Sequence, residues 1–150
     1  MAIVRHIKTI NLELTVTLDA YTAGDVVGGL LTIPVHNAGG GGVLRRLITV
    51  DEDAQSEGYT LYLFDQLPST IANDAAFAPT IADLRKLIGT VTIAAGDYVT
   101  VNSLVYTIDE VDLEFTAANG NLYGYLVATD TPDYANADAV YLRFVVDLDA

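Results

Sequence analysis

Several residue types that support common kinds of chemistry are missing or scarce in this chain. It has no cysteine and no tryptophan, and its 150 residues include only two histidines and seven basic side chains. Without cysteine it has no disulfide, no thiolate metal site and no cysteine nucleophile. The 20 acidic residues bring the formal net charge to −13. Because phosphate binding requires clustered Lys and Arg, we expect no nucleic acid among its partners.

A long apolar run is also missing. The longest stretch without a charged residue, Val26 to Leu44, is interrupted by Pro34 and several glycines, so we expect no membrane span. Residues 1–10 do not have the apolar stretch and cleavage site of a signal peptide. They do carry Arg5 and Lys8, in contrast to the acidic body. This segment is therefore either an arm that docks on an acidic neighbour or an ordinary first strand.

Apolar residues are abundant, at 51% hydrophobic against 18% charged. One domain of 150 residues buries roughly 70% of its unfolded surface. The apolar excess then has two interpretations. Either it lies at contacts with other subunits, or it fills the sandwich completely and leaves a Thr- and Tyr-covered exterior.

Alternation with a period of two predicts strands along most of the chain. Between 140 and 148, Val140, Leu142 and Phe144 alternate with Tyr141 and Arg143. The Asn119-Gly120 dipeptide predicts a hairpin, because both residues tolerate positive φ. We expect one all-β domain over residues 1–150, an antiparallel β-sandwich of jelly-roll type.

One short helix is predicted within the sandwich, near residues 79–88. Pro79 suits the start of a helix, Ile81, Leu84 and Ile88 recur at near-helical spacing, and Gly89 suits its end.

Two segments are apolar on both faces: Tyr59–Asp65 and Leu122–Thr129. Such strands either lie in the middle of the fold or turn their second face to another subunit. Together with the N-terminal segment and an outward tyrosine of the last strand, they supply our candidate interface residues: Ile3, Arg5, Ile7, Lys8, Tyr62, Phe64, Tyr123, Tyr125, Val127 and Tyr141.

Motifs for metal binding and catalysis are missing. His6 and His36 have no ligand-like spacing, and the acidic run Asp51, Glu52, Asp53 and Glu57 departs from the EF-hand pattern, so we interpret it as a solvated loop. No serine lies in a G-x-S-x-G elbow, and the Gly39–Gly42 run does not continue into a phosphate-binding Lys-Ser/Thr, so we interpret it as a loop. We expect no enzyme, no cofactor and no metal.

Carbohydrate chemistry is the exception that residue types leave open. An acidic chain always contains candidate carboxylate pairs for a glycosidase. Tyrosines such as Tyr123, Tyr125 and Tyr141 offer faces on which sugars stack.

Six segments carry a resemblance to a known group of proteins. They are Tyr21–Gly29, Gly39–Leu44, Leu61–Asp65 with Pro68, Asn73–Phe77, Ile88–Val91 and Leu122–Val127. In their order and spacing they resemble small bacteriophage structural proteins of the head or tail.

The resemblance implies a β-sandwich of the virion, assembled in the host cytoplasm, that decorates or cements the capsid surface. Its partners would be the major capsid protein or other virion proteins, and further copies of itself in a homo-oligomer such as a trimer. The alternative is a receptor- or glycan-binding module of a fibre or adhesin. No catalytic residue belongs to the pattern.

Overall fold

The computed structural model describes residues 6–149 of the chain. These residues form nine strands, one turn of α-helix and one 3-10 turn. In chain order they are β1 (His6–Glu13), β2 (Val26–Pro34), β3 (Gly40–Asp51), β4 (Tyr59–Phe64), α1 (Ile81–Leu84), β5 (Leu87–Ile93), η1 (Ala95–Asp97), β6 (Val99–Val101), β7 (Leu104–Ala117), β8 (Asn121–Ala128) and β9 (Val140–Leu148).

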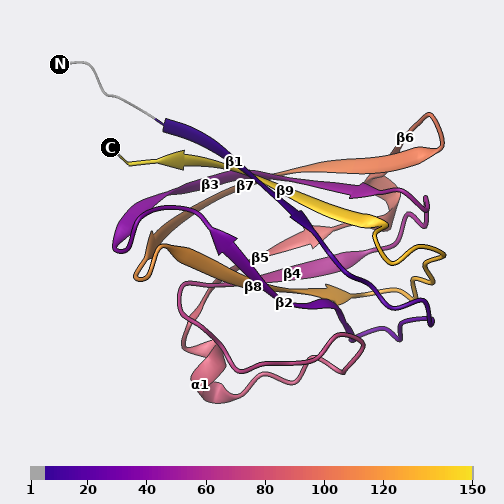
Figure 1. The fold of residues 1–150 in the computed structure, drawn as a ribbon, viewed down its shortest axis with the longest axis horizontal. Helices are drawn as coiled ribbons and strands as arrows, with labels where there is room; N and C mark the ends of the chain where they lie inside the picture. Colours follow the sequence, from indigo (N-terminus) through magenta and orange to yellow (C-terminus); the bar gives the residue numbers. More distant parts are fainter. Residues whose placement is uncertain (1–5, 150) are drawn as a thin grey trace.

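The strands form two antiparallel sheets that pack face to face (Figure 1). One sheet has the order β1-β9-β3-β7-β6 and the other β2-β8-β4-β5. Within them β1 pairs with β9, β2 with β8, β3 with β7, and β4 with β5. These nested pairs are those of one long hairpin folded over on itself, which is the jelly-roll arrangement. The predicted all-β sandwich of jelly-roll type is confirmed.

The main core lies between the two sheets. Its members include Leu47 and Phe144 from the five-stranded sheet and Leu61 and Leu126 from the four-stranded sheet, all fully buried. The alternation read from β9 is confirmed, because Val140, Leu142 and Phe144 are buried while Arg143 is exposed. Asn119-Gly120 forms the β7–β8 hairpin, with Gly120 at φ +87°. Clear alternation of apolar and polar residues therefore predicted the strands that have one solvent-exposed face.

The predicted helix near 79–88 is shorter than expected. It spans Ile81–Leu84, and Thr80 rather than Pro79 caps it, in a capping box with Asp83. Ile81 is 72% exposed, so the near-helical spacing did not mark a buried face. The end of the predicted helix belongs instead to β5, where Leu87 pairs with Phe64. No helix of the described residues is both long and apolar enough to cross a membrane.

The glycine run is also more ordered than predicted. Only Gly39 lies in the turn, with φ +81°, whereas Gly40–Gly42 begin β3. A Cβ at Gly40 would lie 2.3 Å from the His36 ring, and one at Gly42 would lie 2.6 Å from the Asp147 carbonyl oxygen. The glycines are needed because side chains and backbone approach this strand too closely for a Cβ.

Candidate functional site

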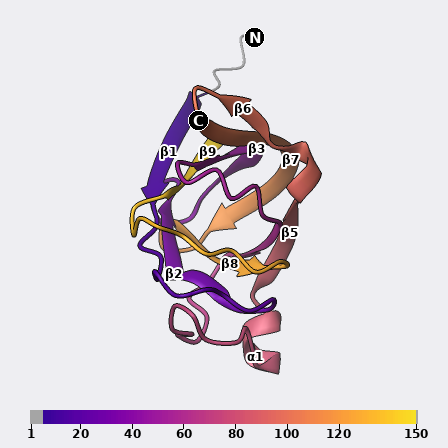
Figure 2. The same cartoon turned by 90° about the vertical axis from the view of Figure 1, so that its right-hand side faces the viewer.

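The outer face of the four-stranded sheet holds most of the predicted interface residues, and the chain itself covers it. Residues 65–86, here called the covering loop, lie beneath this sheet (Figures 1 and 2). Ile71 and Phe77 from the loop pack on a second apolar cluster, which contains the predicted residues Tyr62, Phe64, Tyr123, Tyr125 and Val127. Four of these five are buried and Tyr62 is half-buried. Because an intramolecular loop occupies their face, the four buried residues are not accessible to a partner, and Tyr62 keeps only part of its surface exposed.

Side-chain hydrogen bonds hold the covering loop to the sheet. The Tyr125 hydroxyl donates to the carbonyl oxygen of Ser69 and accepts from the Ile71 amide at 2.9 Å. Asp83 accepts from the amide and hydroxyl of Ser69 at 2.8 and 2.9 Å and from the Thr80 amide at 2.9 Å. These bonds lower the pKa of Asp83 to about 2, since they stabilise its ionised form. The loop is thus a fixed part of the fold.

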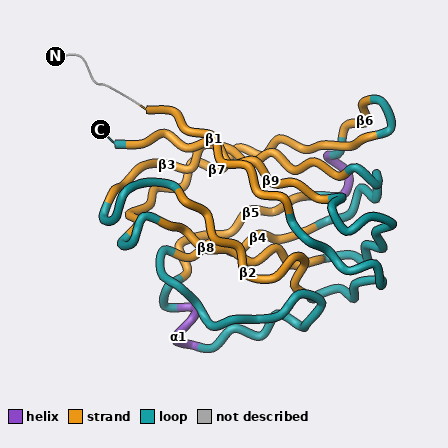
Figure 3. The backbone as a smooth tube through the Cα atoms, in the orientation of Figure 1, coloured by secondary structure: helices purple, strands orange, loops and turns teal. Residues whose placement is uncertain are grey.

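The outer face of the five-stranded sheet has no such cover. In Figures 1 and 3 no described segment crosses it. It carries the apolar side chains Ile48, Val50, Val99, Val101, Leu104, Tyr106, Ile108 and Tyr141, here called the apolar band. Ile108 is 55% exposed and Val101 54%. The band is therefore the main uncovered apolar feature of the described sheets.

Strand register makes the band continuous. Val99, Tyr106, Val50 and Tyr141 lie side by side on β6, β7, β3 and β9, in one row across the sheet. Ile108 and Ile48 are paired in the next row, and Val101 pairs with Leu104 on the other side. Cross-strand neighbours on one face lie about 5 Å apart. The side chains consequently form one patch and not separate exposed residues.

Charged side chains border the band at both ends of its strands. At one end Glu13 is the register partner of Tyr141, and the Glu52 carboxylate also lies near the Tyr141 hydroxyl. Partial desolvation and these carboxylates raise the pKa of Tyr141. At the other end, Arg143 lies in the Ile48 row, and Arg46 contacts Glu110 at 3.8 Å. Arg143 has no ion pair with any described carboxylate.

Of the other five predicted residues, Ile7 and Tyr141 lie on the open face, Lys8 lies at the edge between the two sheets, and two fall outside the described part of the chain. Ile3 and Arg5 lie outside the described residues. Ile7 is 63% exposed on β1 and lies on the outer face, in the row of Asp147. Lys8 is exposed and donates to the Pro34 carbonyl oxygen at 3.0 Å. Of the ten predicted residues, only Tyr141 belongs to the apolar band.

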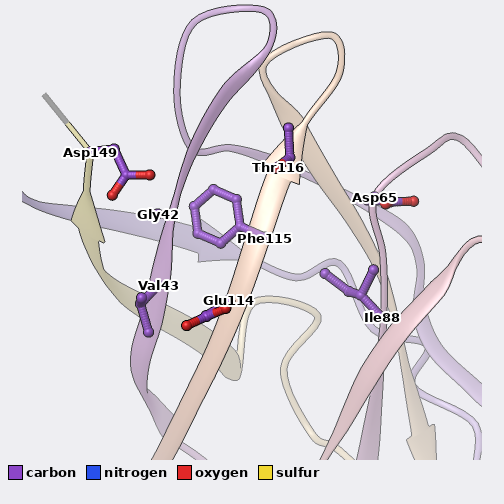
Figure 4. Close-up of a pocket in the computed structure, with 8 residues that line it drawn as sticks. All are labelled: Gly42, Val43, Asp65, Ile88, Glu114, Phe115, Thr116 and Asp149. Carbon is purple, nitrogen blue, oxygen red and sulfur yellow. The ribbon is translucent and has the colours of Figure 1, made fainter.

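A cavity of about 500 Å³ opens at one end of the sandwich (Figure 4). The Phe115 ring lies beside Gly42, and Ile88 and Asp65 approach from the other sheet. Asp65, Glu114 and Asp149 give it three carboxylates. It thus disfavours anions, and it contains no nucleophile and base in contact.

Both histidines line a smaller pocket of about 360 Å³ with Lys8 and Asp149. His36 accepts from the Asn37 amide at 2.7 Å through Nδ1, and its Nε2 lies 3.1 Å from the Asp149 carbonyl oxygen. This arrangement requires the neutral tautomer with the proton on Nε2. Nδ1 thus bonds within the β2–β3 turn, and Nε2 joins that turn to Asp149, just after β9.

The acidic run that follows β3 is structural and not a solvated loop. Asp51 is 2% exposed and accepts from the amides of Asp53 and Gln55 at 2.9 and 2.8 Å. Asp53 accepts from the amides of Ala135 and Asn136 at 2.8 and 3.0 Å. Across residues 6–149, no three His, Asp or Glu side chains are grouped so as to hold a metal ion. The carboxylates join two loops.

The sequence prediction missed seven of the eight residues of the apolar band. The signal was present in Leu104–Ile108, where Val105 faces the core while Leu104, Tyr106 and Ile108 face outward. This stretch is apolar on both faces, as are β4 and β8. Only the topology shows which of these second faces the chain covers.

Comparisons with known proteins add little. No protein-family model matches the chain, and no curated protein matches its sequence. Among solved structures, it is similar to the K3 cleaved adhesin domain of Lys-gingipain from Porphyromonas gingivalis w83, with 14% identity and a TM-score of 0.34. The similarity covers 81% of this chain and 63% of the gingipain domain, less than two thirds of its length. At this level it carries no argument about function.

Proposed function

We propose that this chain is a structural protein of a bacteriophage virion that decorates the capsid and stabilises it by binding the shell surface. The observation that carries the proposal is the apolar band on the open face of the five-stranded sheet. Exposed, contiguous apolar surface on a soluble domain marks sites of association. A strongly acidic chain gains solubility from its charge, so the band is the part best suited to contact a neighbour.

Two further observations support this proposal. Jelly rolls are a common architecture of viral capsid proteins, although lectin domains use them too, so the fold fits both candidate functions. The segments that resemble phage structural proteins include Tyr21 and Asn73, which the fold brings together, since the Tyr21 hydroxyl donates to Asn73 Oδ1 at 2.7 Å. Such bonds would stabilise the sandwich that carries the band.

Co-sedimentation tests the proposal. The purified chain is mixed with shells assembled from the major capsid protein encoded in the same genome. We expect the wild-type chain to pellet with the shells and to raise the temperature at which they rupture. Ile108→Asp, in the band, should stay in the supernatant, and Ile81→Asp, an exposed isoleucine of α1 outside the band, should pellet normally. A wild-type chain that leaves shell sedimentation and rupture unchanged would exclude the decoration role.

The alternative is a glycan- or receptor-binding module, and one observation favours it. Tyr106 and Tyr141 share a row on the open face, two strand spacings or about 10 Å apart, so both ring systems are available to a flat ligand. Tyr123 and Tyr125, the other two tyrosines predicted to stack on sugars, are only 6% and 1% exposed. A glycan array should then show binding that Tyr141→Ala abolishes, and an array without signal would remove this alternative.

A further inference from the structure

We infer that the apolar band binds a second copy of this chain, in a two-fold, face-to-face contact whose axis runs across the strands. This inference deepens the proposed function and rests on its premise that the band is an assembly surface. The second copy and the shell compete for the band, so the dimer is the form of the chain away from the shell. Along β9, the order of side chains places Arg143 toward one border of the band and Tyr141, with Glu13 and Glu52 near it, toward the other.

The axis position follows from the rows. A row is a line of paired residues that crosses the sheet. If the two-fold axis runs between the Tyr106 row and the Ile108 row, each residue of one row faces the residue of the other row on the same strand of the second copy. Ile108 then packs over the second copy's Tyr106, and Ile48 over its Val50. The two central rows, both apolar on β3 and β7, therefore meet each other, and the Leu104 row meets the Glu110 row of the second copy. Such self-complementarity is what a two-fold interface requires, because the same patch serves both subunits.

The same axis pairs the border charges. Arg143 follows Tyr141 as the next outward residue of β9, so it would lie over the second copy's Tyr141. Glu13 is the register partner of that tyrosine on β1, and Glu52 lies near its hydroxyl. Arg143, which lacks an ion pair with the described carboxylates, would thus meet two carboxylates and an aromatic ring. The two-fold repeats this contact at the other border.

The area available suits a reversible dimer. Four full-length strands span about 19 Å, and eight residues span about 27 Å, so the flat face covers about 500 Å² before β6 and side-chain relief are added. A standard interface buries about 800 Å² of each partner. Face-to-face sheets pack with their strands within about 30° of each other, which keeps the rows in approximate register. We expect a dissociation constant in the micromolar range.

Analytical ultracentrifugation over about 1 to 500 µM tests this arrangement. The wild-type chain should convert from monomer to dimer. Ile108→Asp should weaken the dimer at least about 100-fold, because it buries a charge in the band. The control Ile81→Asp should leave the dissociation constant unchanged. A monomer at every concentration, a trimer, or a dimer that tolerates Ile108→Asp would overturn the inference.

Charge exchange gives a second test that does not depend on changing the band. Arg143→Glu and Glu52→Lys should each weaken self-association at least about tenfold, since each places like charges together at both borders. An equimolar mixture of the two variants should restore a heterodimer near wild-type affinity. If the mixture stays monomeric while the wild-type dimerises, the two-fold arrangement is wrong.

Shell binding separates this inference from the proposed function. A wild-type chain that remains monomeric, yet binds shells through Ile108, would refute the second copy and keep the decoration role. A dimer that depends on Ile108 and Arg143 but never binds shells would keep the inferred interface and refute the decoration role.

Discussion

The outer faces of the two sheets are similarly apolar, but the chain covers only one of them. On the four-stranded sheet, Phe64 and Tyr125 are buried by the covering loop. On the five-stranded sheet, Ile108 and Val101 are more than half exposed. The contrast shows that an apolar outer face has no fixed meaning. It becomes a second core where the chain returns to cover it, and it remains available to a partner where the chain does not.

The largest expected effect is on the covered face. Phe64→Ala should lower the free energy of unfolding by about 3–5 kcal/mol, because it removes a fully buried ring that packs edge-on against Tyr125 at 6.2 Å between centroids. Urea unfolding followed by circular dichroism measures the change. A loss below about 1 kcal/mol would mean that the covering loop does not seal this face in solution.

The second prediction concerns how acid acts on the covering loop. The pKa of Asp83 is about 2 in the folded chain, below its ordinary value of 3.8, so its stabilising contribution is complete at neutral pH and declines as pH falls from about 4 to about 2. Asp83→Asn has no such contribution to lose. The stability gap between wild-type and variant should therefore be largest near pH 7 and narrow towards about pH 2.

Urea midpoints of both proteins at several pH values give this gap directly. Because every other carboxyl group is common to the two proteins, their titrations largely cancel in the difference. A gap of constant size across the range would show that the Ser69 and Thr80 hydrogen bonds do not stabilise the ionised form of Asp83.

The contrast between faces also marks what the sequence can predict. Strands with one polar face, such as β9, were found with their inward residues correct, since alternation reports which side meets solvent. Alternation indicated a β-sandwich or barrel, and the resemblance to phage proteins implied the sandwich. In Tyr59–Asp65 and Leu122–Thr129 both faces are apolar, so alternation does not indicate which face is exposed to solvent.

Whether the chain covers the second face of those strands is determined by residues far away in the sequence. Ile71 donates to the Tyr125 hydroxyl across 54 positions, and Asp83 belongs to a turn whose spacing resembled a longer helix. No local pattern announces that residues 65–86 return to this sheet. The open face was missed for the same reason. No pattern within Leu104–Ile108 indicates that the chain leaves its outer side uncovered.

A smaller effect is expected where a single hydroxyl group holds the covering loop. Tyr125→Phe keeps the ring in the second apolar cluster but removes the group that contacts Ser69 and Ile71. Leaving their polar groups unpaired should cost about 1–3 kcal/mol, less than the loss of Phe64. Hydrogen exchange should show faster exchange of the Ile71 amide, and unchanged exchange there would argue against this anchor.

The smallest effect is expected on the open face, and it completes the comparison. Ile108→Thr replaces one exposed β-branched residue by another, so in dilute solution, where the chain is monomeric, the free energy of unfolding should change by less than about 0.5 kcal/mol. Thermal unfolding at low protein concentration measures this value, and Phe64→Ala provides the contrasting core variant. As concentration rises, the wild-type chain should gain thermal stability that Ile108→Thr gains less, because binding a second copy stabilises the folded state by mass action. A loss above about 1.5 kcal/mol at high dilution would mean that the monomer itself buries Ile108, and the two faces would then be alike.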